Sequence, residues 1–126
     1  MSKVPMISIV DDDAWARNGV RELVESLEYK AFAFASAEEF LGSGLITETT
    51  CLITDIQMQG MSGLDLQRHL LNQGHHVPII FITAYPDEVH RDRALGAGAI
   101  CFLSKPFEEQ SLIDCLTLVV GIGSQK

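Results

Sequence analysis

The stretch VPIIFITA, residues 77–84, is an almost uninterrupted apolar run with several β-branched residues. Such a run is typical of a strand that is buried on both faces of a parallel sheet. Pro78 stands at its start, where the missing N–H of proline is tolerated. A strand of this kind needs helices on both sides, so the segment predicts an α/β architecture.

Other short apolar segments alternate with segments in which apolar residues recur at helical spacing. We expect strands at residues 6–10, 30–34, 51–55, 77–84 and 99–104. We expect helices at residues 14–27, 36–42, 62–71, 86–96 and 107–120. This alternation predicts a single (βα)5 domain with a doubly wound parallel sheet and the flavodoxin-like strand order 2-1-3-4-5.

Several expected helices begin at residues that favour a helix start. Ser36 is followed three residues later by Glu39, which is the capping-box pattern. Ser62 is a second expected N-cap, and Pro86 is expected in the first turn of the next helix. These positions give the predicted helices defined starting points.

The composition indicates one globular domain that neither spans a membrane nor binds nucleic acid. The 126 residues contain no apolar run near the roughly 18 residues of a membrane span, and MSKVPMISIV does not resemble a secretory signal. We therefore expect a cytoplasmic protein. The net charge of −8 would repel a polyanion, so direct nucleic-acid binding by this chain is not expected.

The three cysteines are Cys51, Cys101 and Cys115, an odd number without C-x-x-C spacing. This pattern supports neither a disulfide framework nor a zinc site. Cys51 and Cys101 lie in apolar runs, so buried, reduced thiols are expected.

Polar residues follow four of the expected strands. Residues 11–13 (Asp-Asp-Asp), Asp55, Thr83 and Lys105 all come directly after or at the end of a strand. The carboxyl ends of parallel strands share one edge of the sheet, so these side chains are expected together. Packed carboxylates repel one another unless a proton or a cation neutralises them, and an all-oxygen set suits Mg²⁺.

The same residues fit phosphoryl transfer. Lys105 would bind a phosphate as a point charge, and Thr83 would donate a hydrogen bond to it. One carboxylate is free to act as a nucleophile that forms an acyl phosphate. Positioning and charge neutralisation are what this reaction requires. Asp13 is instead expected as a helix-start charge.

Four segments together resemble the receiver domain of bacterial two-component response regulators. They are IVDDD (9–13), LITDIQMQGMSGLDL (52–66), IIFITA (79–84) and GAGAICFLSKPF (96–107). SAEEFL (36–41) and the FLSKPF ending are most similar to the FixJ-type branch, whose members usually carry a C-terminal DNA-binding domain. The resemblance implies a receiver domain at residues 1–121 and a C-terminal tail or the start of a linker at 122–126.

The resemblance implies a role for each acidic residue. Asp55 would accept the phosphoryl group from the phosphohistidine of a sensor histidine kinase. Asp12 would bind Mg²⁺ directly and Asp11 through water, with Asp55 and the backbone carbonyl of Gln57 completing the protein ligands.

The resemblance also implies a switch. Thr83 would be the switch hydroxyl, Lys105 the phosphate-binding lysine and Phe102 the switch aromatic. The surface of the last two helices and the last strand would then change, and a homodimer would form after phosphorylation. Such a protein is a signalling switch rather than an enzyme, although it catalyses its own phosphorylation and dephosphorylation.

Two local features accompany the resemblance. The Lys105–Pro106 peptide bond is expected to be cis, because only X–Pro bonds adopt cis at modest cost. The Met-Pro-Gly or Met-Pro-Asp that commonly follows the phosphoacceptor is replaced by Met58-Gln59-Gly60. Losing this proline predicts a less constrained loop.

Two other functions compete with this reading. A phosphatase of the haloacid dehalogenase type would use Asp11 as nucleophile in a D-x-D-x-[TV] motif, but Trp15 stands where Thr or Val is required. A structural binding module on a flavodoxin-like fold would need none of the residues Asp55, Thr83 and Lys105. Trp15 itself, three residues after Asp12, is expected near the metal site and is a potential fluorescence reporter.

Overall fold

The computed structural model describes residues 4–123. Its strands are β1 (Met6–Val10), β2 (Lys30–Phe34), β3 (Cys51–Thr54), β4 (Ile79–Thr83) and β5 (Cys101–Ser104). Its helices are α1 (Ala14–Ser26), α2 (Ala37–Leu41), α3 (Gly63–Asn72), α4 (Glu88–Gly96) and α5 (Glu109–Gly123). The strands pair in parallel in the order β2-β1-β3-β4-β5, which confirms the predicted sheet.

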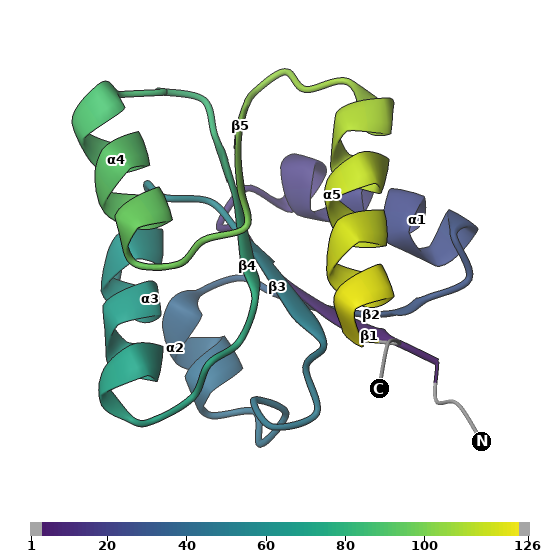
Figure 1. The fold of residues 1–126 in the computed structure, drawn as a ribbon, viewed down its shortest axis with the longest axis horizontal. Helices are drawn as coiled ribbons and strands as arrows, with labels where there is room; N and C mark the ends of the chain where they lie inside the picture. The colour runs from purple at the N-terminus through teal and green to yellow at the C-terminus, as the bar shows by residue number, and fades with distance from the viewer. Residues whose placement is uncertain (1–3, 124–126) are drawn as a thin grey trace.

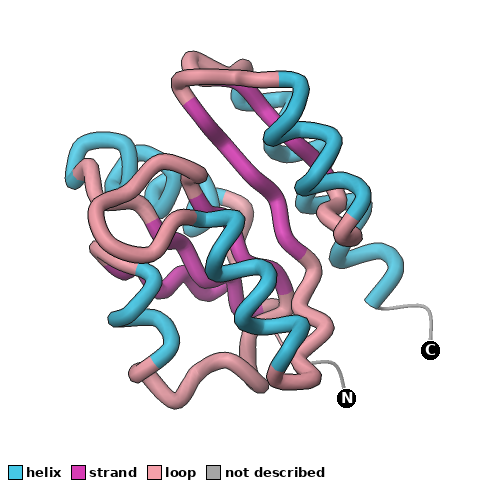
Figure 2. The backbone as a smooth tube through the Cα atoms, turned by 90° about the vertical axis from the view of Figure 1, so that its left-hand side faces the viewer, coloured by secondary structure: helices cyan, strands magenta, loops and turns pink. Residues whose placement is uncertain are grey.

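The sheet lies between two layers of helices (Figures 1 and 2). Helices α1 and α5 cover one face, and α2, α3 and α4 cover the other. Side chains alternate along the strands, so that Ile80 and Ile82 pack in the core beneath α1 and α5 while Ile79 and Phe81 pack in the opposite core. This burial on both faces explains the continuous apolar run of β4.

The helix starts agree with two of the three predicted positions. Ser36 Oγ accepts a hydrogen bond from Glu39 N at 3.0 Å, and Ser62 Oγ accepts one from Asp65 N at 3.0 Å. The prediction for Pro86 was wrong, because Asp87 is the N-cap of α4 and its carboxylate accepts a hydrogen bond from Val89 N at 2.7 Å. An Asp side chain that can bond the first-turn N–H groups sets the start, and Pro86 precedes it.

The ends of the chain bear on the predicted domain boundary. Helix α5 continues to Gly123, into the segment predicted as a tail. Residues 124–126 of that segment lie outside the described residues. Within residues 4–123, no helix combines the length and hydropathy needed to cross a membrane.

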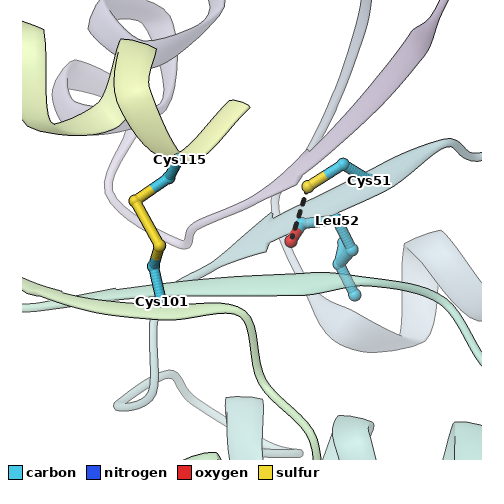
Figure 3. The surroundings of a disulfide bond; sticks show 4 residues. All are labelled: Cys51, Leu52, Cys101 and Cys115. Atoms are coloured by element: carbon cyan, nitrogen blue, oxygen red, sulfur yellow. Dashed lines mark hydrogen bonds between the residues drawn. A yellow bond between two sulfur atoms is a disulfide. The ribbon is translucent and has the colours of Figure 1, made fainter. Parts of the chain in front are cut away.

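The cysteines contradict the expectation of three reduced thiols. Cys101 on β5 and Cys115 on α5 form a disulfide bond, with their Cα atoms 6.4 Å apart (Figure 3). Both residues belong to the core beneath α1 and α5, where the helix lies over its preceding strand. Their spacing in sequence does not reveal this contact. Cys51 is free and buried, and burial raises the pKa of its thiol to about 12; its Sγ lies 3.9 Å from the Leu52 carbonyl oxygen.

We predict that reduction of this disulfide destabilises the protein. The bond joins residues separated by 14 positions, and closing a loop of about 15 residues in the unfolded chain contributes about 3 kcal/mol. Dithiothreitol should lower the free energy of unfolding in urea by about 2–3 kcal/mol, and the C101S/C115S variant should show no further loss. Thiol titration of the unfolded, unreduced chain should detect Cys51 alone. Detection of all three cysteines would contradict the prediction.

Candidate functional site

The ends of three strands bring two carboxylates and one ammonium group together. Lys105 Nζ lies 2.9 Å from Asp11 Oδ2 and 2.8 Å from Asp55 Oδ2. Asp11 follows β1, Asp55 follows β3 and Lys105 follows β5. The sequence therefore predicted correctly that these three residues meet at the carboxyl edge of the sheet.

Backbone pairing places these residues. Val10 and Thr54 are register partners in β1 and β3, so the next residues, Asp11 and Asp55, lie side by side. The N–H of Asp55 donates to the Val10 carbonyl at 3.1 Å, which extends the pairing by one step. The N–H of Lys105 donates to the Thr83 carbonyl at 2.7 Å, and the Lys105–Pro106 bond is cis, as predicted.

The three charges are largely removed from water. Asp11 is 5% exposed and Asp55 is 8% exposed. Burial raises the pKa of Asp11, and the charge of Asp55 adds to this, while the Asp13 N–H and Lys105 oppose it. Burial alone would lower the pKa of Lys105, but hydrogen bonds and charges from Asp55 and Asp11 outweigh it, and the pKa is raised. Lys105 is therefore an ammonium group that only partly compensates the two carboxylates.

The carboxylate of Asp55 is fixed in orientation. Its Oδ1 accepts hydrogen bonds from Ile56 N at 2.6 Å and from Gln57 N at 3.2 Å. Its Oδ2 is the oxygen bound by Lys105. The N–H of Gln57 thus helps to orient the Asp55 carboxylate. The role of the Gln57 carbonyl as a metal ligand stays a prediction.

The other two acidic residues of the first loop have separate partners. Asp12 is exposed, and its Oδ2 accepts a hydrogen bond from Gln59 N at 3.0 Å. Asp13 is the N-cap of α1 and accepts a hydrogen bond from Trp15 N at 3.2 Å. The expectation that Asp13 serves the helix start is confirmed in this geometry.

The loop between β3 and α3 is attached at two points despite its missing proline. Asp12 binds the N–H of Gln59, and Glu38 Oε2 on α2 accepts a hydrogen bond from Met61 N at 3.1 Å. Between these points Gly60 has φ +78°, a conformation that favours glycine. The contributions of Gln59 and Glu38 were not found from the sequence, since both depend on where the loop lies.

Gly63 lets α3 begin directly against the loop that follows β3. A Cβ atom at this position would overlap the carbonyl oxygen of Asp55 and crowd the backbone of Ile56. The N–H of Gly63 donates to the Ile56 carbonyl at 2.9 Å. A residue without a side chain is therefore required here.

The two predicted switch residues have different neighbours in this structure. Thr83 is 1% exposed, and its Oγ1 accepts a hydrogen bond from Tyr85 N at 3.2 Å. Phe102 is partly buried, with its ring centroid 6.5 Å from that of Phe81. Their coupling on phosphorylation stays a prediction.

A cavity of about 350 Å³ lies beside the charged group. Asp11, Asp55 and Lys105 line it together with apolar residues, and Trp15 contributes to its wall. Trp15 is 88% exposed, so it is near the site without being buried in it, as expected. Arg17 was not predicted as a site residue. Its Nη1 donates a hydrogen bond to the Asp11 carbonyl at 2.8 Å and anchors α1 beside the site.

The donor set fits Mg²⁺ in chemistry, although Asp12 is hydrogen-bonded to Gln59. Within residues 4–123, no three His, Cys, Asp or Glu side chains converge to hold a metal. Mg²⁺ however usually takes one or two carboxylates and completes its shell with water and phosphate oxygens. Asp11 and Asp55 supply such a pair, and their negative charge exceeds that of the single Lys105.

Comparison with known proteins agrees with this arrangement. The chain matches the family described as "Response regulator receiver domain" over residues 7–117. It is 40% identical over 111 residues to nodulation protein W of Bradyrhizobium diazoefficiens, which covers 88% of this chain and 49% of that protein. The chain spans about half the length of the curated relatives it matches.

Solved structures show the same fold. The response regulator StyR superposes with a TM-score of 0.89 at 39% identity, covering 98% of this chain and 62% of that one. The crystal structure named FixJ-N superposes with a TM-score of 0.84 at 29% identity, covering 95% of this chain and 96% of that one. The resemblance stated from the sequence is thus confirmed.

We predict that Gly63→Ala destabilises the protein and displaces Asp55. The new methyl group meets backbone atoms, which cannot rotate away, and overpacking of this kind costs about 1–3 kcal/mol. Urea unfolding measures the loss. Gly96→Ala is the matched control, because a Cβ there has nothing within 4 Å. Equal stability of the two variants would contradict the close approach.

We predict that Asp11→Asn stabilises the protein in metal-free buffer at neutral pH. The pKa of Asp11 is raised in the folded state above its usual 3.8, so the ionised group costs stability near pH 7. This cost disappears as the pH falls through the raised pKa towards 3.8. Urea unfolding between neutral pH and pH 4 should show the gain shrinking with acid. A gain that grows on acidification would reverse the sign. Asp92→Asn, which changes an exposed carboxylate on α4, serves as control.

Proposed function

The chain belongs to the response regulator receiver domain family, and from this premise we propose that its Asp55 accepts a phosphoryl group from the phosphohistidine of a sensor histidine kinase. Response regulators of two-component systems are phosphorylated by such kinases, and receiver domains are signalling proteins that are not generally classed as enzymes. Receiver domains in general bind Mg²⁺ at an acidic pocket.

The contact of Lys105 with Asp55 is the observation that carries the proposal. In the transfer, a carboxylate oxygen of Asp55 forms a bond to phosphorus, and the bond from phosphorus to the donor imidazole breaks with its electron pair left on nitrogen. The N–H groups of Ile56 and Gln57 hold the carboxylate in place during the attack. Lys105 Nζ, at 2.8 Å, offers a positive charge to the incoming phosphoryl oxygens.

Asp11, Asp12, Asp55 and the Gln57 carbonyl are the residues we assign to Mg²⁺. A bound Mg²⁺ supplies charge neutralisation for the phosphoryl oxygens. Asp11 and Asp55 are already adjacent through Lys105. Asp12 is held by the Gln59 N–H through Oδ2 and does not join them in a three-carboxylate group within residues 4–123.

The output is proposed from the same family. Phosphate on Asp55 would draw the Thr83 hydroxyl towards it, and Phe102 would fill the space that is left. The surface of α4, β5 and α5 would then change and form a homodimer. Relatives named transcriptional regulatory proteins favour a role in transcription. The place of action that we propose, the cytoplasm, is the one expected from the composition.

The experiment is mass spectrometry after incubation with Mg²⁺ and acetyl phosphate. We expect one added phosphoryl group, located by fragmentation in the peptide that contains Asp55, and no addition to Asp55→Asn. Asp65→Asn changes a half-exposed carboxylate on α3 that is paired with Arg68; it is the matched control and should be labelled normally.

Two outcomes would overturn the proposal. Label that persists in Asp55→Asn and maps to Asp11 would favour the phosphatase of haloacid dehalogenase type. A wild-type chain that takes up neither label nor Mg²⁺ would favour the structural binding module.

A further inference from the structure

The carboxylate of Asp12 is bound by a backbone group 47 residues away in the sequence. Its Oδ2 accepts a hydrogen bond from the N–H of Gln59 at 3.0 Å. The neighbouring carboxylate of Asp11 has the opposite arrangement, because it is buried and its Oδ2 binds Lys105. The side chains of two consecutive aspartates are therefore held by different parts of the molecule.

We propose that the backbone N–H of Gln59 competes with Mg²⁺ for the carboxylate of Asp12, so that Gln59 is a positioning residue that weakens metal binding. This inference rests on the proposed function, in which Asp12 is a metal ligand. In the orientation that Gln59 holds, the carboxylate of Asp12 does not converge with those of Asp11 and Asp55 into a metal-binding group among residues 4–123. Asp12 must therefore turn before it can bind Mg²⁺ together with them, and we infer that this turn breaks the hydrogen bond to Gln59. The affinity for the metal is lower by the free energy of that bond.

The competing donor exists because of the residue type at position 59. Proline has no N–H, and the motif that this stretch resembles has proline at this place. A chain with Met-Pro-Gly here could not hold the aspartate in this way. Met58-Gln59-Gly60 supplies a backbone N–H to an ionised, solvent-exposed acceptor.

The position of the donor is fixed independently of Asp12. Glu38 on α2 accepts a hydrogen bond from Met61 N at 3.1 Å, and it lies against Gly60. Ser62 and Gly63 then begin α3. Because the loop is anchored on its far side, the Gln59 N–H stays available to recapture Asp12 whenever the metal leaves.

The proposal explains why three carboxylates do not converge in this structure. Within residues 4–123 no three acidic side chains form a metal-binding group. Asp11 and Asp55 share Lys105, and Asp12 is occupied by Gln59. The metal-free site is thereby spared the repulsion of a third nearby carboxylate.

The test compares Gln59→Pro with Gln59→Ala. The first removes the N–H, and the second removes only the side chain and keeps the N–H. Mg²⁺ affinity is measured by calorimetry and by the fluorescence of Trp15, which lines the same cavity as Asp11 and Asp55. We expect Gln59→Pro to bind Mg²⁺ about three- to tenfold more tightly than wild type, and Gln59→Ala to match wild type. Equal affinities of the two variants would overturn the proposal.

Hydrogen exchange on the wild-type chain provides a second test that needs no folded proline variant. Saturating Mg²⁺ should accelerate exchange of the Gln59 amide, because its acceptor moves to the metal. The Met61 amide, bound by Glu38, should keep its protection and serves as the internal control. Unchanged protection of Gln59 in saturating Mg²⁺ would contradict the competition.

These experiments distinguish failure of the proposed function from failure of the proposed competition. A wild-type chain that binds no Mg²⁺ and takes up no phosphoryl label would overturn the proposed function, and the competition with it. A wild-type chain that binds Mg²⁺ and is labelled on Asp55, while Gln59→Pro gains no affinity, would overturn the competition alone.

Discussion

The ammonium group of Lys105 binds two carboxylates that follow two different strands. Asp11 and Asp55 come from β1 and β3, which are neighbours in the middle of the sheet, whereas Lys105 comes from the edge strand β5. The lysine side chain must therefore reach across the end of β4 to make both contacts. This bridge requires the order and the parallel direction of β1, β3, β4 and β5, so the site depends on most of the sheet.

The residues that could be predicted from the sequence are those whose position follows from strand order alone. Asp11, Asp55 and Lys105 each follow a strand in a parallel sheet, and parallel ends share an edge. The pair Cys101 and Cys115 could not be predicted in this way, because their contact depends on how α5 turns over β5. The direction of an exposed side chain such as Asp12 depends on a loop, and loops carry no periodic signal.

The loop between β3 and α3 shows two physical ways to restrain a backbone. A proline restrains its own φ angle without needing a contact from any other residue. Here Asp12 and Glu38 restrain the loop from outside, by accepting hydrogen bonds from Gln59 and Met61. Such restraint depends on the state of the acceptors. One of the two restraints is therefore lost when another group binds the carboxylate of Asp12, while the hydrogen bond between Glu38 and Met61 remains.

The separations in the charged group also determine how it responds to ionic strength. The contacts of Lys105 with Asp11 and Asp55 are 2.9 and 2.8 Å long and largely shielded from solvent. Mobile ions screen charges over about 8 Å at physiological salt, and they act on exposed charges far more than on buried pairs. Changes in the salt concentration of the surroundings therefore leave these contacts intact. Only an ion that enters the site and binds the carboxylates directly can compete with Lys105.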